Sequence, residues 1–150
     1  MVFEGSVTQP QLRKIKSMDV LLAEDNKADQ HMMELAFQSS SVKAKLLIVE
    51  DGQSAISFVK REGEFSNAPR PDLIFLDLNL PKKNGIEVLT EIRKYDHLKK
   101  IPIVILTGST FPSDKIACAQ LESTAYLPKP IGVDGLKALI ELLPILLRKD

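Results

Sequence analysis

This chain has little cysteine and no excess of charge of either sign. Cys118 is its only cysteine, so no internal disulfide can form, which fits a reducing cytosol. Lys and Arg number 20, as do Asp and Glu, so no overall field attracts nucleic acid or an anionic membrane. We therefore expect no nucleic-acid partner.

The chain also lacks a long apolar run. The longest stretch, residues 138–147, is too short to cross a bilayer and contains Glu141 and Pro144. Residues 1–10 lack the apolar core of a signal peptide. These absences predict a soluble cytoplasmic protein without a membrane partner.

The length of 150 residues suits a single domain that can bury a substantial core. Residues 1–17 are polar and contain Pro10, so we expect an N-terminal leader or short helix there. Residues 18–150 contain no linker, repeat or low-complexity tract, and we expect them to form one domain. Only one helical segment follows Lys129, so no output domain is expected.

From Met18 onward, short apolar runs alternate with segments of helical periodicity. The predicted strands are 19–23, 46–49, 73–76, 103–106 and 125–128. Predicted helices begin near Asn26, Asp51, Ile86, Pro112 and Val133. In the first of them we expect Ala28, Met32, Leu35 and Ala36 to share the buried face. This alternation is typical of βαβ units and predicts an α/β fold of the (βα)5 type.

Four of the predicted strands end in residues that phosphoryl chemistry uses: Glu24 and Asp25, then Asp77, Thr107 and Lys129. In a parallel α/β sheet, ligands bind outside the carboxyl ends of the strands, so we expect these residues to converge on one pocket. Taken singly, the acidic residues are equally explained as helix or turn caps, Thr107 as an ordinary strand residue and Lys129 as a surface ion-pair partner.

Three carboxylates in one crevice repel each other unless a cation joins them. Hard oxygen ligands in an incomplete cage suit Mg2+ that keeps some water and binds a phosphoryl oxygen. Lys129 can neutralise the charge that a phosphoryl group brings, and Thr107 can donate a hydrogen bond to it. A second acidic pair, Glu50 and Asp51, follows the second predicted strand, and we interpret Asp51 as a helix cap.

Across residues 18–143 the chain resembles the receiver domain of two-component response regulators. The matching motifs are Glu24-Asp25, Asp77 with Leu80-Pro81-Lys82-Lys83-Asn84-Gly85, Thr107-Gly108 and Lys129-Pro130. The resemblance implies the flavodoxin-like fold, with five parallel strands in the order 2-1-3-4-5. Glu24 in place of the commoner aspartate departs mildly from the family pattern.

The resemblance also implies a role for each matching residue. Asp77 would accept the phosphoryl group, and Mg2+ would be bound by Asp25 and Asp77, by Glu24 through water, and by the main-chain carbonyl of Asn79. Thr107 would be the switching hydroxyl, with Tyr126 as the aromatic switch residue, although a core position explains Tyr126 equally well. Lys129 would bridge to the phosphoryl group, and the Lys129–Pro130 bond resembles the family's cis peptide.

The long loop over residues 61–71 resembles that of the stand-alone receivers paired with cyanobacterial and bacterial phytochrome kinases. The resemblance implies a sensor histidine kinase as phosphodonor, possibly of the phytochrome type, and output by contact with an unknown downstream protein. Such a domain is a signalling module and not an enzyme, because it assists only its own phosphorylation and dephosphorylation.

Two other functions use similar residues. A haloacid-dehalogenase-like phosphatase also uses an aspartate nucleophile, but requires a second aspartate two positions later, where this chain has Asn79. A flavodoxin-like module that binds FMN requires a glycine- and hydroxyl-rich phosphate loop, whereas the acidic pair Glu24-Asp25 would repel the phosphate.

The C-terminal helix is predicted to carry two apolar groups. Leu136, Leu139, Ile140 and Leu143 have the spacing of a face that covers the sheet. Four further residues have no obvious core to enter: Leu142, Ile145, Leu146 and Leu147. We expect Pro144 to bend or end the helix, and the second group to form a homodimer interface. Folding of residues 145–147 back onto the domain is the alternative.

Overall fold

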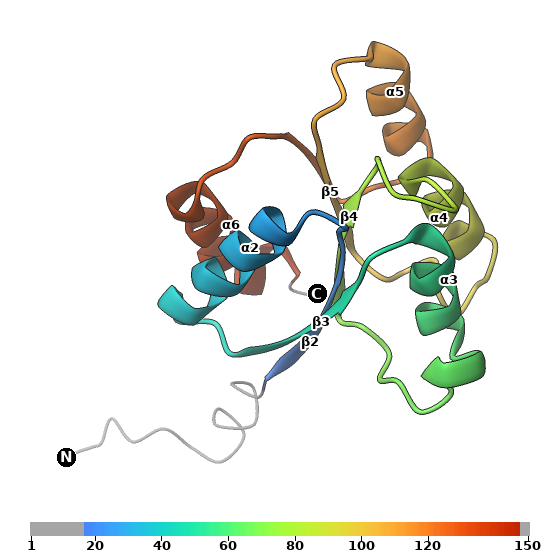
Figure 1. The fold of residues 1–150 in the computed structure, drawn as a ribbon, viewed down its shortest axis with the longest axis horizontal. Coiled ribbons are helices and arrows are strands. Elements are labelled where there is room, and N and C mark those ends of the chain that lie inside the picture. The colour runs from blue at the N-terminus through green and yellow to red at the C-terminus, as the bar shows by residue number, and fades with distance from the viewer. Residues whose placement is uncertain (1–16, 148–150) are drawn as a thin grey trace.

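The computed structural model describes residues 17–147, which form one sheet flanked by helices (Figure 1). The strands are β2 (Met18–Ala23), β3 (Ala44–Val49), β4 (Leu73–Asp77), β5 (Ile103–Thr107) and β6 (Ala125–Pro128). The helices are α2 (Lys27–Ser39), α3 (Gly52–Lys60), α4 (Gly85–Arg93), α5 (Pro112–Gln120) and α6 (Val133–Leu146), with a short 3-10 helix, η1 (Gly63–Phe65). The predicted N-terminal leader lies outside the described residues, apart from Ser17.

All neighbouring strands pair in parallel, in the order β3-β2-β4-β5-β6. Counted along the chain this is 2-1-3-4-5, so the predicted (βα)5 flavodoxin-like fold is confirmed. The register pairs Ala23 with Leu76, Asp77 with Leu106 and Thr107 with Pro128. The carboxyl ends of β2, β4, β5 and β6 therefore lie next to one another at the same end of the sheet.

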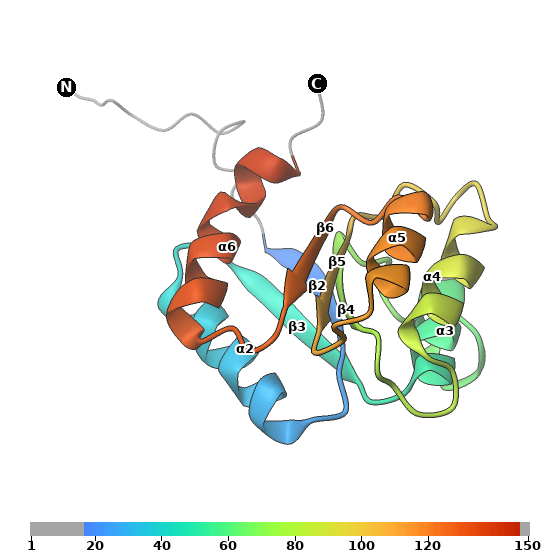
Figure 2. The same cartoon turned by 90° about the horizontal axis from the view of Figure 1, so that it is seen from above.

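Helices α2 and α6 cover one face of the sheet, and α3, α4 and α5 cover the other (Figure 2). The central strands β4 and β5 are buried on both faces, which explains why their sequences are continuously apolar rather than alternating. Alternate residues still divide between two cores: Leu21 and Ile74 face α3 and α4, and Leu22 and Phe75 face α2 and α6.

Side-chain caps fix where three of the helices begin. The Asn26 side chain accepts a hydrogen bond from the Asp29 N–H, and Asp51 accepts one from the Ser54 N–H. Asn84 and Glu87 form a reciprocal capping box at the start of α4. The interpretation of Asp51 as a helix cap is confirmed.

The buried face of α2 differs from the predicted one. Its buried residues are Gln30, Met33, Ala36 and Phe37. Leu35 is exposed, whereas Phe37 packs edge-on against Phe75 with ring centroids 6.2 Å apart. Apolar residues lie on two overlapping faces of this segment, so its periodicity alone did not decide which face turns inward.

Helix α6 does not end at Pro144, one of the two expected outcomes, but continues to Leu146. Proline removes only one N–H from the hydrogen-bond ladder, and the Leu147 N–H still donates to the Leu143 carbonyl at 2.8 Å. Leu147 packs against the core, so it does not belong to the exposed apolar group. None of the helices in residues 17–147 has the length and apolarity that crossing a bilayer requires.

Candidate functional site

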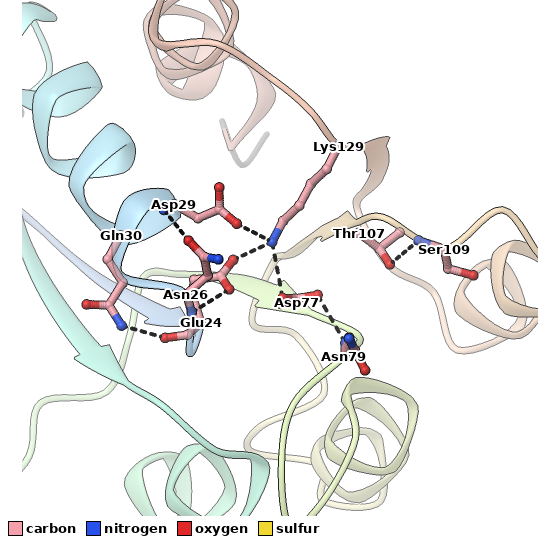
Figure 3. A network of polar contacts seen from close by, with 9 residues as sticks. All are labelled: Glu24, Asn26, Asp29, Gln30, Asp77, Asn79, Thr107, Ser109 and Lys129. Carbon is pink, nitrogen blue, oxygen red and sulfur yellow. Dashed lines mark hydrogen bonds and ion pairs between the residues drawn. The ribbon is translucent and has the colours of Figure 1, made fainter.

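The residues predicted at the strand ends lie around one hollow. A cavity of about 740 Å³ at the carboxyl edge of the sheet is bordered by Asp25, Asp77, Thr107 and Lys129. Figure 3 shows Glu24, Asp77 and Lys129 pointing toward one another from β2, β4 and the end of β6. A larger groove of about 910 Å³ lies at the amino ends of the strands, and none of these residues lines it. The smaller cavity, which the predicted site residues border, is therefore the candidate functional site.

Glu24, Asp25 and Asp77 form an acidic cluster. Each offers a carboxylate oxygen, and these oxygens all lie within 4.8 Å of one another. Glu24 and Asp77 are buried, at 2% and 6% exposure, while Asp25 is exposed. Buried carboxylates this close require compensating positive charge, and an all-oxygen donor set suits a hard divalent cation. The cluster could therefore hold a metal ion.

Glu24 is held by hydrogen bonds to both its side chain and its main chain. The Asn26 N–H donates to its Oε2 at 3.1 Å, and the Gln30 side chain donates to its main-chain carbonyl at 2.7 Å. Burial raises the pKa of Glu24 to about 7, although the hydrogen bonds from Lys129 and Asn26 act in the opposite direction. In the absence of metal this carboxyl group therefore readily holds a proton near neutral pH.

Lys129 extends from the end of β6 into the acidic cluster (Figure 3). Its ammonium Nζ lies 2.6 Å from Glu24 Oε1, 2.8 Å from Asp29 Oδ2 and 3.1 Å from Asp77 Oδ2. Burial lowers the pKa of Lys129, but its hydrogen bonds to Asp29 and Glu24 outweigh this and raise the pKa above its ordinary value. The group therefore remains a cation. The Lys129–Pro130 peptide bond is cis.

Asp77 presents its two carboxylate oxygens to different partners. Oδ1 accepts a hydrogen bond from the Asn79 N–H at 3.0 Å, and Oδ2 accepts one from Lys129. The loop after Asp77 is held against the strand end, because the Gly85 N–H donates to the Leu78 carbonyl at 2.9 Å. A β-carbon on Gly85 would lie 2.6 Å from the Asp77 carbonyl oxygen, so only glycine allows this approach.

Thr107 and Tyr126 lie on the side of the site formed by β5 and β6. Thr107 is buried, and its hydroxyl accepts a hydrogen bond from the Ser109 N–H at 3.0 Å. The Ser109 hydroxyl in turn donates to Asp114 Oδ2 at 2.5 Å, which ties the loop to the first turn of α5. Tyr126 is half-buried, and its hydroxyl has no hydrogen-bond partner among the described residues.

Sequence reasoning missed Asp29 and the pair Ser109 and Asp114. Asp29 lies in the first turn of the helix that Asn26 caps, directly after the acidic pair, and this closeness in the sequence was the available signal. The second acidic pair lies apart from the site: Glu50 pairs with Lys27 and Gln30, and Asp51 caps α3.

The geometry agrees with comparisons to known proteins. The family model of the response regulator receiver domain matches residues 20–141. The chain belongs to this family. The receiver is 43% identical to the response regulator Rcp1 of Synechocystis sp. over 122 residues, which cover 81% of this chain and 83% of Rcp1.

Solved structures extend the likeness. The phosphorylated cyanobacterial phytochrome response regulator RcpA is 40% identical, with a TM-score of 0.77 over 84% of this receiver and 90% of RcpA. The Mn2+-bound form of Rcp1 is also 40% identical, with a TM-score of 0.78 over 89% of this receiver and 96% of Rcp1. As a receiver domain, this chain has a phosphoacceptor role in two-component signalling.

Proposed function

We propose that Asp77 is the phosphoacceptor of this receiver and that a sensor histidine kinase donates the phosphoryl group. The observation that supports this most strongly is the ammonium of Lys129, 3.1 Å from Asp77 Oδ2, inside a cluster of buried carboxylates. A carboxylate oxygen of Asp77 attacks the phosphorus, the bond from phosphorus to the kinase histidine nitrogen breaks, and an acyl phosphate forms.

Glu24, Asp25, Asp77 and the main-chain carbonyl of Asn79 would hold Mg2+, with Glu24 acting through water. Mg2+ held there would supply positive charge that stabilises the transferred phosphoryl group. Lys129 donates hydrogen bonds to those oxygens and offsets the added negative charge. The Thr107 hydroxyl donates a hydrogen bond to the phosphoryl group, and Tyr126 turns inward as Thr107 moves. The changed surface then selects a downstream protein.

The kinase partner is proposed to be of the phytochrome type. Support comes from RcpA, which is a phytochrome response regulator and 40% identical to this chain. The test is transfer of labelled phosphate from purified phytochrome-type histidine kinases, with an unrelated sensor kinase as comparison and Asp77→Asn as the acceptor control. We expect rapid transfer from the phytochrome-type kinase alone. Equally rapid transfer from the unrelated kinase would refute the proposal that the kinase partner is of the phytochrome type.

We further propose that the receiver forms a homodimer through α6. Leu142, Ile145 and Leu146 are 51%, 67% and 51% exposed and lie on one side of the helix at i, i+3 and i+4 spacing. Burying these side chains against a second copy removes apolar area from water. The double variant Ile145→Glu, Leu146→Glu should sediment as a folded monomer, whereas Leu35→Glu on α2 should remain dimeric. A wild-type monomer at high concentration, with and without phosphorylation, would refute the proposal.

A further inference from the structure

Asp29 lies in the same crevice as the acidic cluster but is not part of it. It belongs to the first turn of α2, and its main-chain N–H is held by the Asn26 side chain at 2.9 Å. Its side chain is 27% exposed and reaches Lys129, whose side chain is 21% exposed, at 2.8 Å. The pair is therefore more shielded from water than an ordinary surface salt bridge.

The ammonium of Lys129 has three N–H donors, and three carboxylates take them. Two of these acceptors, Glu24 and Asp77, also belong to the group that could hold a metal ion. The third, Asp29, does not. The oxygens of Glu24 and Asp77 are needed for metal binding and phosphorylation, whereas neither process needs the carboxylate of Asp29. The contact between Asp29 and Lys129 is thus the one that can persist while the rest of the site changes.

The same contact has a cost for phosphoryl binding. Three carboxyl groups contact the single ammonium, those of Glu24, Asp29 and Asp77, and the carboxyl group of Asp25 lies beside two of them. A phosphoryl oxygen that approaches Asp77 needs a donor from Lys129, and the charge of Asp29 competes for the same ammonium. A fixed anion beside the cation therefore weakens the attraction that the cation exerts on a second anion.

We propose that Asp29 is a positioning residue for Lys129, which holds the ammonium over Asp77 and limits, through its own charge, how strongly the site binds a phosphoryl group. This inference rests on the proposed function of Asp77 and Lys129. An acidic residue in the first helical turn would also stabilise α2 through the helix dipole, but that role alone would not alter anion binding at Asp77.

The test is the affinity for beryllofluoride, a phosphoryl analogue, at saturating Mg2+. The chain has no tryptophan to report binding, so bound and free beryllofluoride are distinguished by fluorine NMR. Asp29→Asn keeps an oxygen acceptor for Lys129 but removes the charge, so it should bind beryllofluoride about fivefold more tightly than wild type. Asp29→Glu, which keeps the charge, should stay close to wild type.

Glu34→Gln is the matched control, because it makes the same charge change on α2 at an exposed residue that pairs with His31. It should leave the affinity unchanged. A nitrogen NMR signal from the Lys129 ammonium should keep its wild-type intensity in Asp29→Asn and weaken in Asp29→Ala, where only Glu24 and Asp77 remain as acceptors.

Equal beryllofluoride affinity for wild type, Asp29→Asn and Glu34→Gln would overturn the inference and leave the proposed function intact. Weaker binding by Asp29→Asn would also overturn it. If wild type bound no beryllofluoride while remaining folded, the proposed function would fail, and the inference with it.

Discussion

Replacing Gly52 with alanine should displace the loop between Asp77 and α4, which packs against the start of α3. Gly52 is the first residue of α3, and its N–H donates to the Pro81 carbonyl at 3.1 Å. A β-carbon at this position would lie 1.8 Å from the Lys83 carbonyl oxygen and 2.5 Å from the Lys83 carbonyl carbon. Both are backbone atoms, so the strain cannot be relieved by rotating a side chain. The loop between Asp77 and α4 must move instead.

Overpacking of this kind lowers the free energy of unfolding by about 1–3 kcal/mol. The higher helix propensity of alanine relative to glycine offsets less than about 1 kcal/mol of this loss. We therefore expect a net loss of about 1–2 kcal/mol, which lowers Tm by roughly 2–8 °C for a chain of this size. Because Asn79 lies in the displaced loop, Mg2+ affinity should fall as well.

Urea unfolding followed by circular dichroism measures the first effect, and titration calorimetry with Mg2+ the second. Gly132→Ala is the control, since nothing lies within 4 Å of its β-carbon position and its φ of −73° suits any residue. If Gly52→Ala unfolded at the same urea concentration as Gly132→Ala, the close approach of α3 to this loop would not be a constraint on the fold.

Three further changes probe the site itself. Lys129→Ala should still bind Mg2+ but be labelled by acetyl phosphate about a hundredfold more slowly, because a charge-stabilising donor is lost; a wild-type labelling rate would contradict this. Asp25→Ala should raise the Mg2+ concentration for half-maximal labelling by at least about tenfold, and an unchanged Mg2+ requirement would refute the metal assignment. Burial raises the pKa of Glu24 to about 7, so protons compete with Mg2+ below that pH. Mg2+ affinity measured by calorimetry should therefore fall about tenfold per unit below pH 7 in wild type, and Glu24→Gln should flatten this dependence.

Much of the sheet could be predicted from the sequence because its strands are short apolar runs that end in polar residues. The parallel order then requires the ends of β2, β4, β5 and β6 to meet, which is why Glu24, Asp77, Thr107 and Lys129 converge.

Other features depend on contacts that periodicity does not encode. Two overlapping apolar faces made the register of α2 ambiguous, and packing against Phe75 selected Met33 and Phe37. Asp29 was missed because its significance depends on how far Lys129 reaches across the sheet. The continuation of α6 through Pro144 likewise follows from the turns on either side of the proline, and not from the residue itself.

The central claim is that Asp77 is the phosphoacceptor, and intact-mass measurement after incubation with acetyl phosphate and Mg2+ tests it most directly. Wild type should gain the mass of one phosphoryl group, removable by hydroxylamine as an acyl phosphate is. Asp77→Asn should stay folded, because the amide nearly matches the carboxylate in shape and relieves repulsion with Glu24 and Asp25, and it should gain no mass. Labelling of Asp77→Asn to the wild-type extent would contradict the account.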